Sequence, residues 1–335
     1  MANVLRRRAG ALAAGKGAIT AMQAIRVHAF GGPEVLCPET VADPVAAPGQ
    51  VLVRLRAAGV NPVETYVRSG AYARLPPLPY IPGADGAGEV SAVGAGVTGF
   101  APGQRVYVAG APTYAQLTAA PAEAVWPLPE GLTYAQGAAI GIPYRTAYLA
   151  VHSIGEARPG ERVLVHGGSG AVGVAAIQLA AAGGCDVVAT AGGEEGRRLV
   201  LAQGARAACA HGDAARLQEL SGGVGFDLIV EMLANANLAT DLGLLAERGR
   251  VAVVGSRGTV TIDPRQIMQR TASIRGVMGS TPEERRRIHL ALGAGLRQGV
   301  LRPVVGSVFP LAEAAAAHRA VMTPGAQGKV VLTIQ

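Results

Sequence analysis

From about residue 160 onward, short apolar runs alternate with helical patterns, and this alternation constrains the fold more than any other feature. The runs "RVLVHG", "DVVATAG", "FDLIVEML" and "RVAVVG" are almost continuously apolar, and helical segments separate them. Strands joined by helical crossovers form parallel sheets, and continuously apolar strands are typical of sheets that helices cover on both faces. The pattern predicts an α/β fold with a doubly wound parallel sheet.

A glycine-rich turn follows the first of these strands. Gly167, Gly170 and Gly173 stand at three-residue intervals directly after "RVLV" and open a helix. Glycines let a backbone approach a pyrophosphate closely, and a helix N-terminus offers free N–H groups and a partial positive charge. The turn is one residue wider than the usual G-x-G-x-x-G, but the strand before it and the helix after it favour the same chemistry. It therefore predicts a Rossmann domain that binds a dinucleotide.

The end of the second strand lacks the carboxylate that an NAD-binding unit places there for the ribose hydroxyls. The sequence at this position is "TAGG", and Arg197 and Arg198 follow two glutamates further on. A carboxylate would repel a 2′-phosphate, whereas arginine pairs well with one. The sequence therefore favours NADPH over NADH. The alternative is that both arginines only face solvent on a helix.

The chain before this region follows a different pattern. Residues 51–60, "VLVRLRAAGV", alternate apolar and basic side chains as a half-buried strand does. Prolines at four positions between residues 76 and 82 exclude a helix there. After residue 299 the pattern returns to strand, helix and strand. We therefore expect residues 22–137 and 300–335 to form a β-rich domain, and residues 138–299 to form the nucleotide-binding domain.

The composition excludes several classes of protein. Half of the 335 residues are hydrophobic and 16% are charged, so the chain is globular rather than disordered. The three cysteines lie far apart, without a CxxC or a Cys/His pair at metal-ligand spacing, so we expect no metal. No apolar run has the length of a membrane span. The net charge of +7 suits an anionic ligand or nucleic acid, although the basic residues are scattered.

The first 21 residues contain arginine and lysine but no acidic residue. The segment from Met22 onward, "MQAIRVHAF", suits the start of a folded protein, so we expect residues 1–21 to be a non-structural basic extension. Transit peptides share this composition. We expect a cytoplasmic protein. A mitochondrial location is the alternative if the extension acts as a transit peptide.

Several long segments between Met22 and Gln335 closely resemble one family. They are the glycine turn and the segments "GVNPVETYVRSGAY", "AAIGIPYRTAY", "EMLANANL" and "VVGSRGTVTIDPR". These segments resemble the NADPH-dependent quinone oxidoreductases of the ζ-crystallin type, in the zinc-free branch of the medium-chain dehydrogenase/reductase superfamily. The resemblance implies a GroES-like catalytic domain beside the Rossmann domain, NADPH in the cleft, and a homotetramer or homodimer. Zinc-binding members of the superfamily use Cys and His in the first domain, and the matching positions here carry neither.

The activity that the resemblance implies is the reduction of quinones by NADPH. Hydride chemistry belongs to the cofactor, and the sequence shows no obligatory acid or base. Asn61 and Tyr66 are the candidates for positioning the acceptor or the nicotinamide. An alternative activity is reduction of the carbon–carbon double bond of an enone or alkenal, because both acceptors are flat and electron-poor. The family also implies binding of AU-rich RNA, but no aromatic platform of the single-strand type is evident.

The resemblance assigns cofactor contacts residue by residue. Tyr66 matches a tyrosine beside the nicotinamide, Gly192 matches the glycine that closes the second strand, and His211 matches a histidine near the adenine. Asn237 matches the second asparagine of the family's "LANVNL". The other contacts lie in three short loops: Ser169, Gly170, Ala171, Val172 and Gly173 in the glycine turn, Val254, Gly255, Ser256 and Arg257 after one strand, and Val277, Met278 and Gly279 after the next. Arg197 is added to these contacts because the second strand ends without a carboxylate. Each alone has an ordinary structural interpretation, but together they fall at strand ends where such sheets bind ligands.

Overall fold

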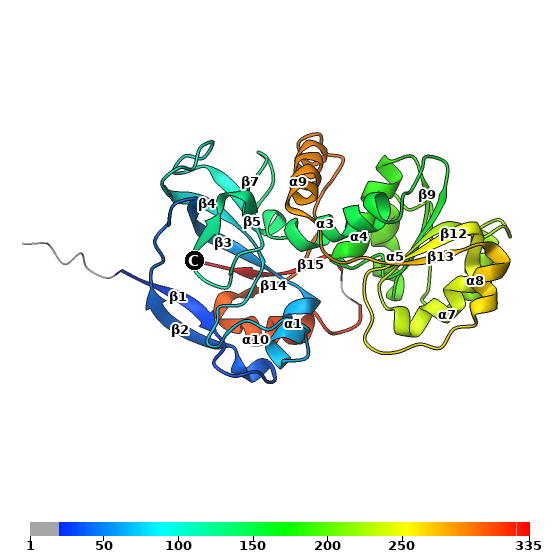
Figure 1. Ribbon diagram of the computed structural model, residues 1–335, viewed down its shortest axis with the longest axis horizontal. Helices are drawn as coiled ribbons and strands as arrows, with labels where there is room; N and C mark the ends of the chain where they lie inside the picture. The colour runs from blue at the N-terminus through cyan, green and yellow to red at the C-terminus, as the bar shows by residue number, and fades with distance from the viewer. Residues whose placement is uncertain (1–19, 326) are drawn as a thin grey trace, which may run out of the picture.

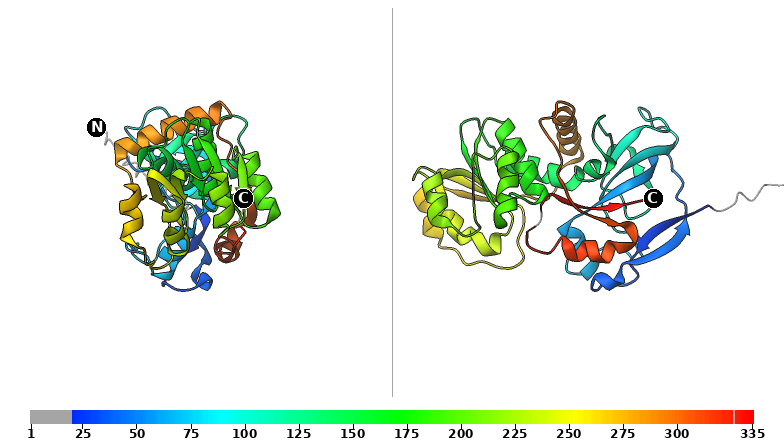
Figure 2. Two further views of the ribbon diagram at one scale, coloured as in Figure 1. Left: turned by 90° about the vertical axis from the view of Figure 1, so that its right-hand side faces the viewer. Right: turned by 180° about the vertical axis from the view of Figure 1, so that it is seen from behind.

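The computed structural model describes residues 20–325 and 327–335 of the chain. Figure 1 shows two lobes, and each is built on its own β-sheet, with seven strands in one sheet and six in the other. The view from behind shows the same two lobes (Figure 2). The predicted fold class, a doubly wound Rossmann sheet beside a β-rich GroES-like lobe, is confirmed.

The six-stranded sheet is entirely parallel. Its strands are β8 (Arg162–Val165), β9 (Asp186–Thr190), β10 (Ala207–Cys209), β11 (Phe226–Glu231), β12 (Leu245–Val253) and β13 (Ser273–Gly276). Their order across the sheet is β10-β9-β8-β11-β12-β13. The chain runs from β8 to one edge and then returns to the other side, so the order reverses between β8 and β11. Ligands of doubly wound sheets bind at this point, beyond the carboxyl ends of the strands.

Helices cover both faces of the parallel sheet. They are α3 (Gly141–Tyr148), α4 (Ala171–Ala182), α5 (Gly193–Ala202), α6 (Ala214–Leu220), α7 (Ala234–Leu244), α8 (Pro264–Arg270) and α9 (Pro282–Arg297), with the π-helical turn η3 (Leu149–Ser153) after α3. Successive strand residues face opposite sides. Val163 and Val165 therefore join the core under α3, α4 and α9, while Leu164 joins the core under α6 and α7. Because α4 carries no charged residue, it can be buried along nearly its whole length.

The other lobe combines strands from the first 130 residues with the last two strands of the chain, and its main sheet is mainly antiparallel. Its strands are β1 (Ala21–Arg26), β2 (Cys37–Ala42), β3 (Gln50–Val60), β4 (Asp85–Val93), β5 (Arg105–Ala109), β6 (Leu117–Pro121), β7 (Val125–Pro127), β14 (Val305–Pro310) and β15 (Lys329–Thr333). Its helices are α1 (Pro62–Ser69), α2 (Tyr134–Gly137) and α10 (Ala314–Ala320), with short turns η1 (Pro33–Val35), η2 (Ala122–Ala124) and η4 (Leu311–Glu313). The main sheet runs β14-β15-β3-β4-β5-β7, with β6 also on β3, and β1 pairs with β2 in a separate two-stranded sheet and bridges to Ala115. The last strand, β15, therefore lies beside β3 (Figure 1).

The β-rich lobe includes Ala21, one residue before the predicted start of that domain at residue 22. Ala21 opens β1 and pairs with Ala42, so it belongs to the sheet rather than to the predicted extension of residues 1–21. The hydrophobic residue Met22 is buried next to it. Residues 1–19 of the predicted extension lie outside the described residues. Within residues 20–325 and 327–335, no helix combines the length and the hydrophobicity that crossing a bilayer requires.

Candidate active site

A cleft of about 1040 Å³ lies where the two lobes meet, beyond the carboxyl ends of β8, β11, β12 and β13. Residues from both lobes line it, including Ile142 and Arg145 from α3. Most of the residues predicted from the sequence come together here: Asn61, Tyr66, Gly170, Ala171, Val172, Gly173, Val254, Gly255, Ser256, Arg257, Val277, Met278 and Gly279. The fold thus gathers segments from four separate parts of the chain around one space.

The remaining predicted residues do not line the cleft. Gly192 and His211 are neighbours at the ends of β9 and β10, because a Cβ on Gly192 would lie 3.8 Å from the His211 ring. Arg197 is half-buried on α5, and its charge acts on the nearby Cys209. Ser169, within the glycine turn, is buried. Asn237 points to Glu231, to which it donates at 3.1 and 3.2 Å. A cofactor-binding role for all these residues stays a prediction.

The glycine turn shows two different uses of glycine. A Cβ on Gly173 would lie 2.3 Å from the carbonyl oxygen of Gly167 and 2.6 Å from Cα of Gly168, so no side chain fits there. A Cβ on Gly170 would meet only that same carbonyl oxygen, at 3.5 Å, and Gly170 lines the cleft. No side chain caps the N-terminus of α4. Its first N–H groups therefore remain available for an anion in the cleft.

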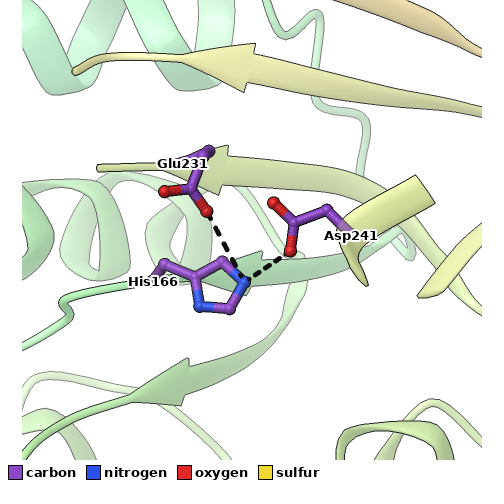
Figure 3. A group of neighbouring side chains, drawn as sticks. All are labelled: His166, Glu231 and Asp241. Carbon is purple, nitrogen blue, oxygen red and sulfur yellow. Dashed lines mark hydrogen bonds and ion pairs between the residues drawn. The ribbon is translucent and has the colours of Figure 1, made fainter. Parts of the chain in front are cut away.

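Three buried titratable side chains lie close together, and one of them, His166, directly precedes this turn in the chain (Figure 3). Nε2 of His166 is 2.9 Å from Oδ1 of Asp241 and 3.7 Å from Oε2 of Glu231. Burial raises the pKa of Glu231 to about 7, against the opposing charge of His166. Burial alone would lower the pKa of His166. The hydrogen bond to Asp241 and the negative charges of Asp241 and Glu231 outweigh burial, so the pKa of His166 is raised.

This cluster fixes the strand ends where the sheet order reverses. His166 follows β8 and also contacts Thr190 at the end of β9, with Nδ1 3.1 Å from Oγ1. Glu231 ends β11 and accepts from the backbone N–H of Leu233 and from Asn237. His211 reaches the same Thr190 hydroxyl at 3.0 Å. Polar contacts that the sequence did not reveal therefore position the predicted residues His211 and Asn237.

A second buried network forms the floor of the cleft in the β-rich lobe. Nζ of Lys329 donates to Oδ1 of Asn61 and, at 3.0 Å, to Oδ2 of Asp85. Lys329 is 2% exposed and Asp85 is fully buried. Nδ2 of Asn61 lies 2.9 Å from Oδ2 of Asp85 and 3.0 Å from Oε1 of Glu64, whose pKa is raised because burial outweighs the charge of Lys329. The hydroxyl group of Tyr114 also donates to Oε2 of Glu64, at 2.7 Å.

Lys329 lines the cleft, and the sequence analysis missed both Lys329 and Asp85. Asn61, in contrast, was predicted as a positioning residue, and its local role is evident in the structure. It is the N-cap of α1 and forms a capping box with Glu64. Pro62 at the first position of α1 supports the same helix start. The network thus connects the start of α1 with the start of β15.

The mouth of the cleft is formed by one side chain from each lobe. The hydroxyl of Tyr72 is 4.0 Å from Sδ of Met278, which is 79% exposed. Tyr66 and Tyr72 both line the cleft, as does Ile142. The mouth therefore offers flat and apolar surfaces to a bound molecule.

Comparisons with known proteins agree with this architecture. A family model described as "Alcohol dehydrogenase GroES-like domain" matches residues 47–130, and one described as "Zinc-binding dehydrogenase" matches residues 171–293. A human protein named quinone oxidoreductase is 47% identical over 322 residues, which cover 93% of this chain and 98% of the human protein. The chain belongs to the quinone oxidoreductase family. It is therefore an oxidoreductase of the medium-chain dehydrogenase/reductase superfamily, as the resemblance implied.

Solved structures similar to this chain include proteins described with different nucleotides. A crystal structure titled NAD-dependent alcohol dehydrogenase is 33% identical, with a TM-score of 0.88, and covers 94% of this chain and 100% of that chain. A mycobacterial protein complexed with NADPH is 31% identical, with a TM-score of 0.85, and covers 93% of this chain and 100% of that chain. These relatives leave the choice between the two nucleotides open.

The cleft does not fit the zinc that one matching family description mentions. Among the described residues that line it, none is a cysteine, histidine, aspartate or glutamate. The charged side chains on its wall are Arg145, Arg257 and Lys329, and all three are positive. Zinc needs thiolate, imidazole or carboxylate ligands. The described residues that line the cleft therefore offer zinc no ligand.

Proposed function

We propose that this protein reduces quinones with NADPH bound in the cleft. The observation that carries the proposal is the position of the cleft, which extends from the uncapped start of α4 to the apolar surfaces around Tyr66 and Ile142. The first end suits the pyrophosphate of a dinucleotide, and the second suits a flat acceptor. The names of the relatives support the same substrate class.

The residues of the chain would bind and orient, and the cofactor would do the chemistry. When bound, NADPH supplies the hydride. The N–H groups at the start of α4 donate to its phosphate oxygens, and Gly170 leaves room for them to approach. Arg145 and Arg257 add positive charge along the wall of the cleft. Tyr66 and Ile142 hold the flat rings together and exclude water.

Purified protein is expected to oxidise NADPH in the presence of 1,2-naphthoquinone or 9,10-phenanthrenequinone. The expected turnover is within the range of ordinary enzymes, on the order of 1 to 1000 per second. NADPH oxidation is followed at its near-ultraviolet absorbance band, and an alkenal is tested beside the quinones under the same conditions. Consumption of the alkenal alone would contradict quinone reduction and support the double-bond reductase instead.

We also propose that Arg197 selects NADPH over NADH by pairing with the 2′-phosphate. Arg197→Ala is expected to weaken NADPH binding by about 10- to 100-fold and to leave NADH binding unchanged, because one charge-assisted hydrogen bond is lost. Arg198→Ala is the matched control, since Arg198 is exposed and already pairs with Glu194 on its own helix at 3.9 Å. Fluorescence titration of each reduced nucleotide measures the affinities. Equal affinities of the unmodified protein for the two nucleotides would contradict the preference.

A further inference from the structure

This chain uses arginine instead of lysine almost everywhere. All but two of its 30 lysine and arginine residues are arginine, and the lysines are Lys16 and Lys329. Lys16 lies outside the described residues, whereas Lys329 is buried on the floor of the cleft. An arginine guanidinium keeps its proton in proteins, but a lysine ammonium can release one. A lysine at this position therefore supplies chemistry that the other cationic side chains of the cleft, Arg145 and Arg257, lack.

Two glycines make room for Lys329 and its partner Asp85. A Cβ on Gly59 would lie 2.6 Å from Cε of Lys329 and 2.2 Å from the carbonyl oxygen of Ala138. A Cβ on Gly141 would lie 2.2 Å from Oδ1 of Asp85. Neither glycine has a positive φ angle, so space rather than backbone conformation explains both. The fold is therefore built closely around this ion pair.

The hydrogen bonds of the network leave one donor free at the cleft. Nζ of Lys329 has three N–H groups, and two of them are used by Asn61 and Asp85. Both amide hydrogens of Asn61 are used as well, by Glu64 and Asp85. Asn61 therefore has no hydrogen to offer a bound acceptor, although the sequence suggested it as a positioning residue. The remaining N–H of Lys329 is the free donor of this network.

We propose that Lys329 is the proton donor of the reaction. The proposal rests on the proposed function, because it concerns the same cleft and the same acceptor. A quinone that accepts a hydride gains two electrons and carries negative charge on one oxygen. Nζ of Lys329 gives one proton to that oxygen, so an O–H bond forms as an N–H bond breaks, and the product is the neutral hydroquinone. Solvent then returns a proton to the amine. In the overall reaction, one quinone, one NADPH and one proton give one hydroquinone and one NADP⁺.

Asp85 and Asn61 are the positioning residues for this donor. Asp85 balances the charge of the ammonium, and its other oxygen accepts from the backbone N–H of Ile142 at 2.8 Å. The carboxylate is therefore held by a helix start in addition to Lys329. Asn61 ties the ammonium to α1. Both groups fix Nζ at the floor of the cleft, which Lys329 and Asn61 line.

Two substitutions of Lys329 test the donor role. Lys329→Arg keeps the positive charge but cannot release a proton, and Lys329→Met removes both. Both variants are expected to lower kcat with 9,10-phenanthrenequinone by at least about 100-fold, which is typical of a lost general acid. NADPH affinity, measured by fluorescence titration, is expected to change by less than about threefold, because turnover rather than binding is affected. The other lysine gives a matched control, Lys16→Arg.

A spectroscopic measurement tests the role without relying on activity. With ¹⁵N-lysine labelling the protein has two side-chain ammonium groups, and Lys329→Arg removes one of their signals, so the assignment is direct. Adding hydroquinone to the complex with NADP⁺ is expected to shift the signal of Lys329 beyond the shift caused by NADP⁺ alone. The signal of Lys16 is the internal control.

The possible outcomes separate this proposal from the proposed function. If the unmodified protein reduces quinones and Lys329→Arg does so at a similar rate, the donor role is wrong while the function stands. If only Lys329→Met is slow, positive charge is sufficient and the donor role is again wrong. If the unmodified protein reduces no quinone, the function fails and the donor role fails with it. If the variants do not fold, an unchanged Lys329 signal in the unmodified protein on adding hydroquinone would overturn the proposal.

Discussion

Gly170→Val is expected to abolish NADPH binding while the protein remains folded. Gly170 has a φ angle of −75°, which valine adopts freely, and its Cβ would meet only one atom, at 3.5 Å. The side chain would therefore occupy open space on the wall of the cleft, where the pyrophosphate is proposed to lie against the first turn of α4. The expected loss of affinity is at least about 100-fold, or roughly 2.7 kcal/mol.

A second glycine in the same turn provides the contrasting variant. Gly173→Ala places a methyl group 2.3 Å from a backbone oxygen of Gly167, and backbone atoms cannot move aside as a flexible side chain can. We therefore expect this variant to be destabilised by about 1–3 kcal/mol, as overpacked cores are. Thermal unfolding and nucleotide titration of both variants separate the two effects. A Gly170→Val protein that still binds NADPH normally would show that the pyrophosphate lies elsewhere.

The fold was largely predictable because its strongest signal is periodic. The strands of the Rossmann lobe are apolar on both faces, and this follows directly from their burial between two layers of helices. Element boundaries were harder to predict. The segment "LATDLGLLAERG" has a helical pattern throughout, but the helix ends at Leu244 and β12 begins at Leu245. Arg248 then adopts a left-handed φ angle of 60°, and the pairing with β11 shifts register there.

The candidate site was predictable only in part, because sequence patterns describe neighbours along the chain. The glycine turn and the loops after β12 and β13 are short contiguous segments, and a family resemblance could place them. Lys329 and Asp85 are separated by 244 residues, and neither stands in a recognisable motif. Their partnership depends on the pairing of β15 with β3 and of β3 with β4. The scarcity of lysine was the one signal in the sequence that could have identified Lys329.

The network around His166 illustrates the same limit. His211 and Asn237 were assigned to the cofactor from the resemblance, but the sequence gave no reason for their positions. Thr190 and Glu231 supply that reason, since each contacts one of these residues and also lies close to His166. Such contacts join strand ends that are distant in the sequence. They become visible only when the order of the strands is known.

Asp85→Ala is expected to be among the most destabilising single substitutions in the β-rich lobe. It leaves the ammonium of Lys329 buried without its counter-ion, and it removes the acceptor for the backbone N–H of Ile142. Breaking a buried ion pair by removing one partner costs about 3–5 kcal/mol. The single tryptophan, Trp126, lies on β7 in the same sheet, so its fluorescence during urea unfolding reports on this lobe.

A double variant distinguishes the loss of the pair from the loss of packing. Asp85→Ala combined with Lys329→Met removes both charges, so no buried ion is left without a partner. The double variant is therefore expected to lose at least about 1 kcal/mol less free energy of unfolding than the sum of the two single losses. Arg216→Ala is the control, because Arg216 pairs with Glu219 on an exposed surface, where such pairs contribute less than about 1 kcal/mol.

Additive effects of the two substitutions would contradict the coupling between these residues. A strong coupling, in contrast, has a consequence for catalysis. The carboxylate of Asp85 accepts a hydrogen bond from Nζ of Lys329 at 3.0 Å in a buried site, so the position of the proposed donor depends on this pair. The same ion pair that stabilises the lobe would then hold Nζ in place at the floor of the cleft. Stability of the β-rich lobe and supply of the proton would thus depend on one contact between β15 and β4.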